Sequence, residues 1–184
     1  MRVTGPVLAL GLAMLASVVG LAPSAGGSSG SEGEVVGSPP WREAKWPFLM
    51  DQWGTGRAFQ CAPADCGVAL TLYVRPKIGF CNCTSGVSDD AELDRVGDVE
   101  LIAPHFMPLA EGHAIAVGHM NGRSRAYSFA SRDAALAVAF NDKCDVVVAT
   151  VTANGPLPEN AEAHALAFLN SQPVLHWVEV SLGL

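Results

Sequence analysis

Five cysteines are the residues of this sequence whose chemistry is easiest to anticipate. Cys61, Cys66, Cys81 and Cys83 lie within 23 residues of one another, and Cys144 stands apart. In an oxidising compartment such a group is typical of disulfide bonds, and each bond would stabilise the domain by about 2–4 kcal/mol. We therefore expect two structural disulfides among the four clustered cysteines, together with one spare thiol.

The pairing of the cysteines stays open at this point. Cys81 and Cys83 would project from the same side of an extended strand, about 6.6 Å apart, which is near the limit of disulfide reach. Each is therefore expected to pair elsewhere, while Cys61 and Cys66 either bond to each other or bond to the strand pair. Cys144 adjoins a buried strand, and we interpret it as a small core residue with a free thiol. The alternatives for Cys144 are a bond to a leftover strand cysteine and an intermolecular bond.

The same cysteines allow two further kinds of site. Thiolates select copper(I) or zinc, and a Cys-x-Cys pair presents two sulfur atoms together, so Cys81 and Cys83 with Cys61 or Cys66 could hold a soft metal. The spacing differs from the Cys-x-x-Cys of zinc ribbons. A thiol–disulfide oxidoreductase is the third hypothesis, although no cysteine opens a helix, where its pKa would fall.

Histidine and methionine residues offer a weaker metal signal. The positions concerned are His105, Met107, His113, His119 and Met120, a composition similar to that of exported copper carriers. His113 and His119 would lie about 20 Å apart along an extended strand, too far for one ion. We therefore interpret these histidines as ordinary hydrogen-bonding residues of strand ends and loops.

A small basic and aromatic face is the best candidate binding patch after the cysteines. Arg123, Arg125 and Tyr127 alternate along the chain, so they share one side of a strand. Such a group can bind the carboxylate or phosphate of a ligand. The alternative is a solvated hairpin edge protected by its charges. The acidic run between residues 89 and 98 is interpreted as a solvated helix face.

Periodicity predicts the elements that position these residues. Strands are expected over 68–75, 78–83, 146–151 and 174–182, with a turn at Pro76 between the first two. Asp89 and Glu92 form a capping box that predicts a helix to residue 96. A hairpin over 114–129 is expected to turn at Asn121-Gly122, and helices are expected over 131–141 and 159–170.

This order of elements predicts an α+β domain of two layers, with helices packed on one face of a mainly antiparallel sheet. The order resembles the Mog1/PsbP-like group of small α/β domains. That resemblance rests on the order of elements, so it implies a fold and no function.

The first 40 residues predict the location of the chain. Residues 7–22 are apolar and uncharged and end in small residues, which is typical of a secretory signal peptide over 1–25, with an uncleaved anchor as the alternative. Residues 26–40 are rich in Gly and Ser and predict a flexible linker before a single domain over 41–184. Trp41, Trp46 and Trp53 follow at once and are expected to dock on the core.

The charge and the missing motifs narrow the function. The net charge is −7 without a basic cluster, which disfavours nucleic acid as a partner. No second long apolar stretch predicts a membrane span after cleavage, and no Gly-x-Ser-x-Gly, His-Glu-x-x-His or phosphate-binding glycine loop is present. We expect a non-enzymatic periplasmic or extracellular accessory or ligand-binding module, without a cofactor, whose partner is a small molecule or a protein. Copper or zinc binding and thiol–disulfide exchange are the alternatives.

Overall fold

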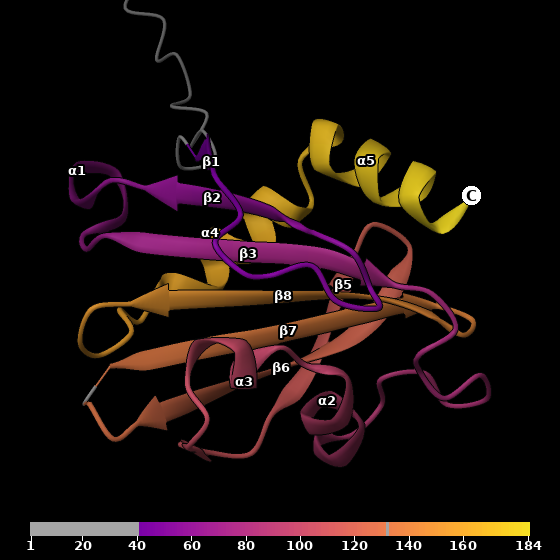
Figure 1. The fold of residues 1–184 in the computed structure, drawn as a ribbon, viewed down its shortest axis with the longest axis horizontal. Helices are drawn as coiled ribbons and strands as arrows, with labels where there is room; N and C mark the ends of the chain where they lie inside the picture. Colours follow the sequence, from indigo (N-terminus) through magenta and orange to yellow (C-terminus); the bar gives the residue numbers. More distant parts are fainter. Residues whose placement is uncertain (1–40, 132) are drawn as a thin grey trace, which may run out of the picture. The chain divides into compact units, whose positions relative to one another are not determined.

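The computed structural model describes residues 41–131 and 133–184. The expected signal peptide (1–25) and linker (26–40) lie outside the described residues. The strands form one antiparallel sheet in the order β1-β2-β3-β8-β7-β6-β4, and β5 pairs with β6 (Figure 1). The strands are β1 (Arg42–Ala44), β2 (Arg57–Cys61), β3 (Leu70–Lys77), β4 (Phe106–Pro108), β5 (His113–Val117), β6 (Met120–Phe129), β7 (Ala134–Asp142) and β8 (Asp145–Ala153). The helices are α1 (Pro63–Cys66), α2 (Asp90–Val96), α3 (Val99–Ile102), α4 (Ala161–Leu169) and α5 (Gln172–Leu182).

Helices cover both faces of the sheet, whereas the sequence predicted helices on one face only. Alternate residues of β7 and β8 belong to two separate hydrophobic clusters, so the clusters lie on opposite faces. One cluster packs against α4 and α5 and the other against α2 and α3, as Figure 1 shows. The α+β class is confirmed, and the two-layer arrangement is corrected to a sheet between helices. The physical reason is that β7 and β8 are apolar on both sides and need cover on both.

Strand β7 replaces the helix that was expected over 131–141. Its alanines favour a helix when taken alone, because alanine has the highest intrinsic helix propensity. Residues 134–140 are nevertheless all buried in a strand that lies between β6 and β8. Tertiary burial therefore outweighs the local propensity at the centre of this fold.

Strand β3 continues through Pro76, where a turn was expected. Pro76 pairs with Val147 of β8, whereas β2 pairs with β3 only as far as Val74. The proline therefore lies where one side of β3 has no neighbouring strand, a position that tolerates the missing N–H. The return strand expected over 78–83 is absent from the described residues, which form a turn and loop there.

The hairpin of β5 and β6 exists, but it turns earlier than expected. Val117 pairs with Met120, so the turn is at Gly118 and His119, while Asn121 and Gly122 belong to β6. The pairing is shifted by an even number of residues, so the expected division of side chains between the two faces is retained.

A substitution at Gly122 tests how closely β7 packs against this part of β6. A Cβ at Gly122 would lie 2.0 Å from the carbonyl oxygen of Ala139 and 2.7 Å from Phe140 Cα. We expect Gly122→Ala to lower the free energy of unfolding by about 1–3 kcal/mol or more, because β7 would have to move. Gly79→Ala is the control, since its Cβ would meet nothing within 4 Å and only its φ of +67° is strained. Urea unfolding measures both, and an equal loss in the two variants would contradict the steric explanation.

The C-terminal segment forms α5, where a strand was expected. Val174, Val178 and Leu182 are buried at a spacing of four residues, so they form one stripe against the sheet. Pro173 lies in the first turn, where a proline is favoured. The alternating apolar residues that suggested a strand include Val180, which is 64% exposed.

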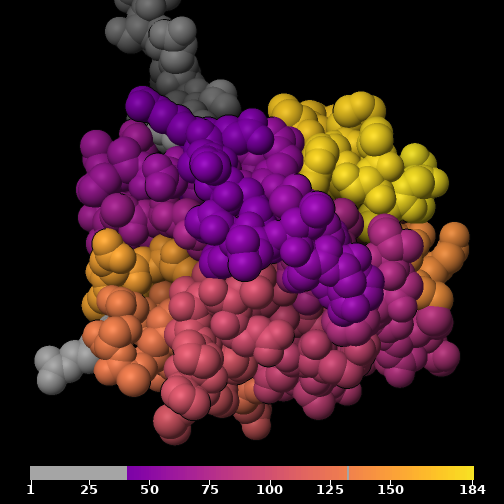
Figure 2. Space-filling view, viewed as in Figure 1, coloured from indigo at the N-terminus to yellow at the C-terminus, as the bar shows by residue number. Residues whose placement is uncertain are grey.

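The three early tryptophans dock on the core, as the sequence predicted. Between β1 and β2 the chain forms an irregular strap (residues 45–56) that crosses the sheet face bearing α2 and α3 (Figure 2). The ring contacts are Trp41 with Phe168 at 5.4 Å, Trp46 with Tyr73 at 6.0 Å, and Trp53 with Phe80 at 4.5 Å. Trp46 and Trp53 therefore hold the strap by aromatic packing, while Trp41 packs against α4 on the opposite face.

Candidate functional site

A buried ion-pair cluster lies beneath the strap, and sequence reasoning missed it. Arg75 and Lys77 project from β3 and are 2% and 4% exposed, while Asp98, just before α3, is 6% exposed. Asp98 accepts hydrogen bonds from Arg75 Nε at 2.6 Å and Nη2 at 2.8 Å. Lys77 Nζ lies 2.8 Å from the same carboxylate. One carboxylate therefore joins two buried cations on one face of β3.

The strap supplies the fourth charge of this cluster. Asp51 Oδ2 lies 2.8 Å from Arg75 Nη1, and the Arg75 guanidinium stands 5.8 Å from the ring of Trp46. Lys77 also donates to the carbonyl oxygen of Val96 at 2.6 Å, and burial lowers the pKa of Lys77, against the effect of Asp98. Two positive and two negative charges compensate one another, so the cluster fastens strap, β3 and α3 together. The signal in the sequence was two cations at alternate positions of an otherwise apolar strand.

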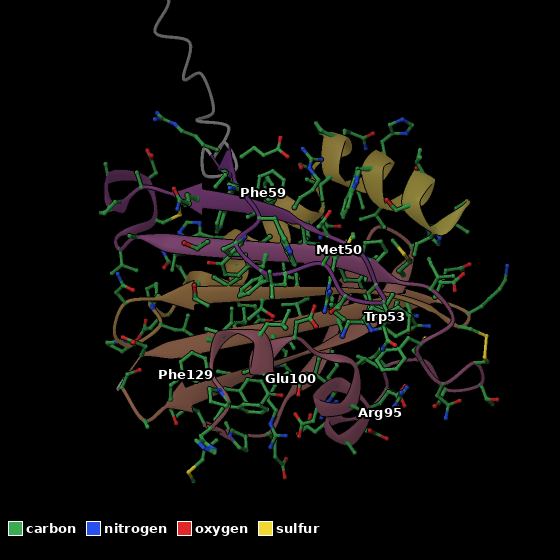
Figure 3. All side chains as sticks on the ribbon, in the orientation of Figure 1. Met50, Trp53, Phe59, Arg95, Glu100 and Phe129 are labelled. Atoms are coloured by element: carbon green, nitrogen blue, oxygen red, sulfur yellow. A yellow bond between two sulfur atoms is a disulfide. The ribbon has the colours of Figure 1, made fainter. Side chains whose placement is uncertain are left out.

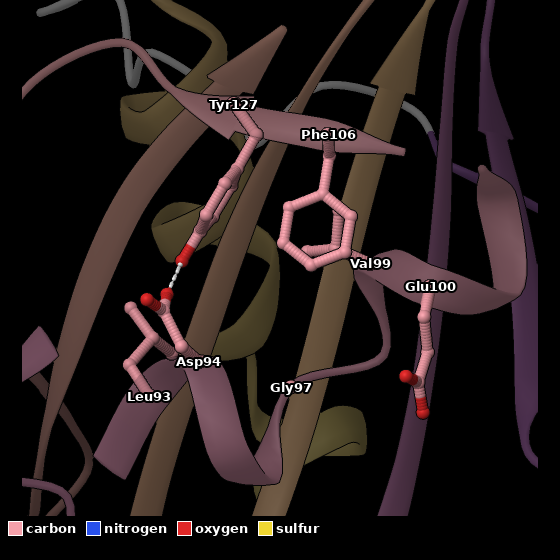
Figure 4. Close-up of a pocket in the computed structure, with 7 residues that line it drawn as sticks. All are labelled: Leu93, Asp94, Gly97, Val99, Glu100, Phe106 and Tyr127. Atoms are coloured by element: carbon pink, nitrogen blue, oxygen red, sulfur yellow. Dashed lines mark hydrogen bonds between the residues drawn. The ribbon is translucent and has the colours of Figure 1, made fainter. Parts of the chain in front are cut away.

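The structure brings Arg123, Arg125 and Tyr127 together on β6, but it turns them toward α2. Arg123 Nε forms an ion pair with Asp90, and Arg125 Nη1 lies 3.1 Å from Asp94 Oδ2. Tyr127 donates its hydroxyl to Asp94, as Figure 4 shows. Burial, together with this hydrogen bond, raises the pKa of Tyr127 well above its usual range.

Two acidic residues of α2 therefore reach the sheet, which corrects in part the expected solvated face. Asp90 and Asp94 pair with β6, and Glu92 pairs with Arg95. The capping box is confirmed, because the Asp89 side chain accepts from the Glu92 backbone N–H. The arginines expected to bind a ligand hold a helix in place.

Asp90 gives a test of this contact through its pH dependence. Hydrogen bonds from the Gly112 backbone and from Arg123 hold the pKa of the Asp90 carboxyl below its usual range. Such a group stabilises the fold above its unfolded pKa of about 3.9 and loses this effect as the pH falls through the folded value. We expect the urea midpoint to fall less steeply below pH 4 in Asp90→Asn than in the wild type. The exposed Asp65→Asn variant should keep the wild-type slope, and a wild-type slope in Asp90→Asn would contradict the assignment.

A small cavity lies between α2, α3 and this part of β6. Its lining comprises Leu93, Asp94, Gly97, Val99, Glu100, Phe106 and Tyr127 (Figure 4). Its volume is about 10 Å³, which is the space of about one water molecule. The cavity therefore accommodates solvent and no larger ligand.

The cysteines form two disulfides in the structure. Cys61 bonds to Cys66 across α1, which is the local pairing that the sequence left open. Cys83 bonds to Cys144, which joins the loop after β3 to the β7–β8 turn. The assignment of Cys144 as the free thiol is therefore corrected: Cys81 is free and buried. We expected Cys81 and Cys83 on a strand, where both side chains would project to the same side. The two residues lie in a loop, so their side chains are free to point in different directions.

The proposed soft-metal site does not fit this arrangement. Three of its four sulfur atoms, those of Cys61, Cys66 and Cys83, belong to disulfide bonds and are not thiolates. Within residues 41–131 and 133–184, no group of three or more His, Cys, Asp or Glu side chains is placed to hold a metal ion. His113 instead lies 2.7 Å from Glu162 of α4 through its Nε2 atom.

The remaining free cysteine, Cys81, is hydrogen-bonded through its backbone to a cysteine of the second disulfide. Cys81 Sγ donates to the carbonyl oxygen of Lys143 at 3.2 Å, and the Cys81 backbone N–H donates to the carbonyl oxygen of Cys144 at 3.1 Å. Burial, together with Glu92 and Asp145, raises the pKa of Cys81 to about 11. The thiol is therefore protonated at neutral pH and attacks other groups slowly.

An open polar hollow borders the Cys83–Cys144 bond on its outer side. Cys83 is exposed there, and the hollow is also lined by residues of the β5–β6 turn and the β7–β8 turn, including His119, Asn121 and Lys143. The structure thus places His119 and Cys83 in the lining of one hollow, which no sequence pattern signalled.

A second open hollow lies at the β4 edge of the sheet. It measures about 570 Å³ and is lined by Pro104, His105, Phe106, Met107, Ser128, Phe129 and Ala130. Met107 is 70% exposed beside it, and Phe129 is labelled in Figure 3 at this end of the sheet. Among the described strands, β4 pairs only with β6, so its outer edge has no neighbouring strand.

Comparison with known proteins adds no assignment to this geometry. In the described part of the chain, no helix has both the length and the apolar character needed to cross a bilayer. The chain matches no protein-family model, and no curated protein matches its sequence.

Proposed function

We propose that this protein is an exported, disulfide-stabilised binding module that takes a small amphipathic ligand in the hollow at the β4 edge. Ligand pockets are mostly apolar and aromatic with a few polar groups, and they measure about 300–1,000 Å³. The β4 hollow has this character: Phe106, Phe129 and Met107 supply apolar contacts, while His105 and Ser128 supply polar ones. This hollow is the observation that carries the proposal.

The chemistry of the lining favours a ligand with an aromatic ring and an anionic group. The ring would pack against Phe106 and Phe129, and the anion would accept a hydrogen bond from Ser128 or from His105. The arginines of β6 do not compete for that anion, because Asp90 and Asp94 already pair with them. The ligand is therefore expected to bind at the edge of the sheet and not on its face.

Export is supported by two kinds of observation. Two disulfide bonds are present, and such bonds persist in oxidising compartments. The apolar run near the N-terminus has the composition of a secretory signal. A periplasmic or extracellular location follows as part of the proposal, and mass spectrometry of the native protein would find the cleaved N-terminus near Ala25.

Binding of 1-anilinonaphthalene-8-sulfonate tests the proposed site, because this dye carries both an aromatic system and an anion. We expect its fluorescence to rise with the folded protein and the rise to be lost in Met107→Glu. Val180→Glu is the matched control, since Val180 is 64% exposed on α5 and should leave the signal unchanged. An equal loss in both variants, or no binding to the wild type, would contradict the assignment of the hollow.

A further inference from the structure

We propose that Cys81, Cys83 and Cys144 form a thiol–disulfide relay, in which Cys81 displaces Cys83 from its bond with Cys144 and creates a reactive thiol at the surface. This activity is independent of ligand binding at the β4 edge. It uses Cys81, the one cysteine of the described residues that is not in a disulfide.

Contact between backbones places the three cysteines together. The Cys81 N–H donates to the Cys144 carbonyl oxygen, so the two residues are direct neighbours across the loop and the β7–β8 turn. The Cys81 sulfur lies 3.2 Å from the carbonyl oxygen of Lys143, the residue before Cys144. The Cys81 backbone is therefore held next to that of Cys144, while Cys83 lies two residues further along the same loop.

The Cys83–Cys144 bond and the alternative Cys81–Cys144 bond would restrict the unfolded chain to nearly the same degree. Cys83 and Cys144 are 61 residues apart in sequence, and Cys81 and Cys144 are 63 apart. The stabilisation from closing a loop depends on the logarithm of its length, so this difference is negligible. Local packing and solvent exposure therefore decide which bond is present.

The exchange balances without an added oxidant or reductant. Cys81 loses its proton to solvent, and its thiolate attacks Cys144 Sγ. The Cys81–Cys144 bond forms as the Cys83–Cys144 bond breaks, and Cys83 leaves as a thiolate that takes up a proton. The sheet keeps one disulfide at this end throughout, so the loop stays attached to the β7–β8 turn.

The exchange moves the free thiol from a buried position to an exposed one. Cys81 is 6% exposed, whereas Cys83 is exposed and lines the polar hollow with His119 and Lys143. In this hollow the Lys143 charge favours the thiolate form of Cys83, against Asp142, whose carboxylate lies 3.7 Å from Lys143 Nζ. A freed Cys83 could then attack a small external disulfide, forming a mixed disulfide and releasing one thiol of that reagent. Small disulfides of the oxidising compartment are the substrate class.

The environment of Cys81 sets the pH dependence of the relay. Glu92 of α2 and Asp145 of β8 disfavour the thiolate and Arg95 of α2 favours it, while Asp142 ends β7 and Lys143 lies in the adjoining turn. Below the pKa, the thiolate fraction rises about tenfold for each pH unit. The exchange should therefore be slow at neutral pH and about tenfold faster at pH 8 than at pH 7.

Alkylation of the folded protein tests the proposal. The wild type is held in excess N-ethylmaleimide without denaturant, quenched in acid and mapped by peptide mass. We expect the label on Cys83, with Cys81 bonded to Cys144, and a labelling rate about tenfold higher at pH 8 than at pH 7. A label on Cys81, or a protein that stays unlabelled over a day at pH 8, would overturn the relay.

Two serine variants give an independent test. In Cys83→Ser incubated with oxidised glutathione as the two-electron oxidant, Cys81 should bond to Cys144, so thiol titration in denaturant should find no free thiol and the intact mass should show no bound glutathione. Two free thiols in this variant would contradict the proposal. In Cys81→Ser the attacking group is missing, so the folded protein should not be labelled at Cys83. Labelling of that variant at the wild-type rate would show that the bond opens without Cys81. If Cys83→Ser fails to fold, the wild-type map and Cys81→Ser still decide the question.

Discussion

Replacement of Asp98 by alanine is expected to destabilise the protein by about 3–5 kcal/mol, because removing one partner of a buried ion pair leaves uncompensated charge. Here two cations lose their shared partner, since Arg75 and Lys77 are both buried and both lie against this carboxylate. Burial already disfavours the charged form of Lys77 and lowers its pKa. Urea unfolding at pH 7 with both disulfides intact gives the free energy directly.

Asp51→Ala is the matched control for this measurement. Asp51 also pairs with Arg75, but its side chain is 40% exposed, so water replaces much of what is lost. Exposed pairs contribute about 0–1 kcal/mol, and a loss in that range is expected. A loss in Asp98→Ala no greater than that in Asp51→Ala would contradict the view that the buried carboxylate organises the cluster.

Replacement of Cys144 by alanine is expected to remove about 4 kcal/mol of stability, because the bond to Cys83 closes a long loop. Cys66→Ala removes the short Cys61–Cys66 loop, and the same relation predicts a loss of about 2 kcal/mol. Urea unfolding at pH 6, where thiol exchange is slow, allows the two variants to be compared. An equal loss in both would contradict the dependence on loop length.

Cys83→Ala separates the loss of one sulfur atom from the loss of the bond. If Cys81 takes over the bond to Cys144, this variant should lose clearly less stability than Cys144→Ala, which leaves both loop cysteines without a partner. Equal losses would mean that no replacement bond forms. The comparison therefore links the stability of the fold to the proposed relay.

Local signals were sufficient to predict several elements of the fold. The Asp89 cap and the β-branched run of β8 depend on residues adjacent in the sequence, and both are confirmed. The α4 helix also follows from its own apolar residues. The order of these elements was enough for the α+β class, although not for the cover on the second face of the sheet.

Long-range contacts decided the elements that the sequence misassigned. The alanines of β7 form a strand because β6 and β8 pair with both of its edges, and these partners lie outside any local window. The turn expected at Asn121-Gly122 is absent because both residues pair with β7, which lies so close to Gly122 that a Cβ would clash with it. In both cases tertiary packing outweighed a correct local preference.

The candidate sites were least accessible to sequence reasoning. Arg123 and Arg125 were correctly placed on one face, but the acidic helix that pairs with them is more than 30 residues away. The bond of Cys83 to Cys144 joins residues 61 positions apart, and cysteine spacing does not specify connectivity. Asp98 could not be predicted as the shared partner of Arg75 and Lys77, because the sequence did not show where α3 lies in the fold.

The order of the strands has a consequence for biosynthesis. Strand β3 pairs with β8, and Leu70 lies opposite Ala153. The middle of the sheet therefore joins segments some 80 residues apart along the chain. The sheet formed by β1, β2 and β3 therefore cannot pair with β8 until most of the polypeptide has been made. Pairing of strands so distant in sequence is intrinsically slow. A nascent chain that remains unfolded for this long is in a suitable state to be threaded through a translocation channel.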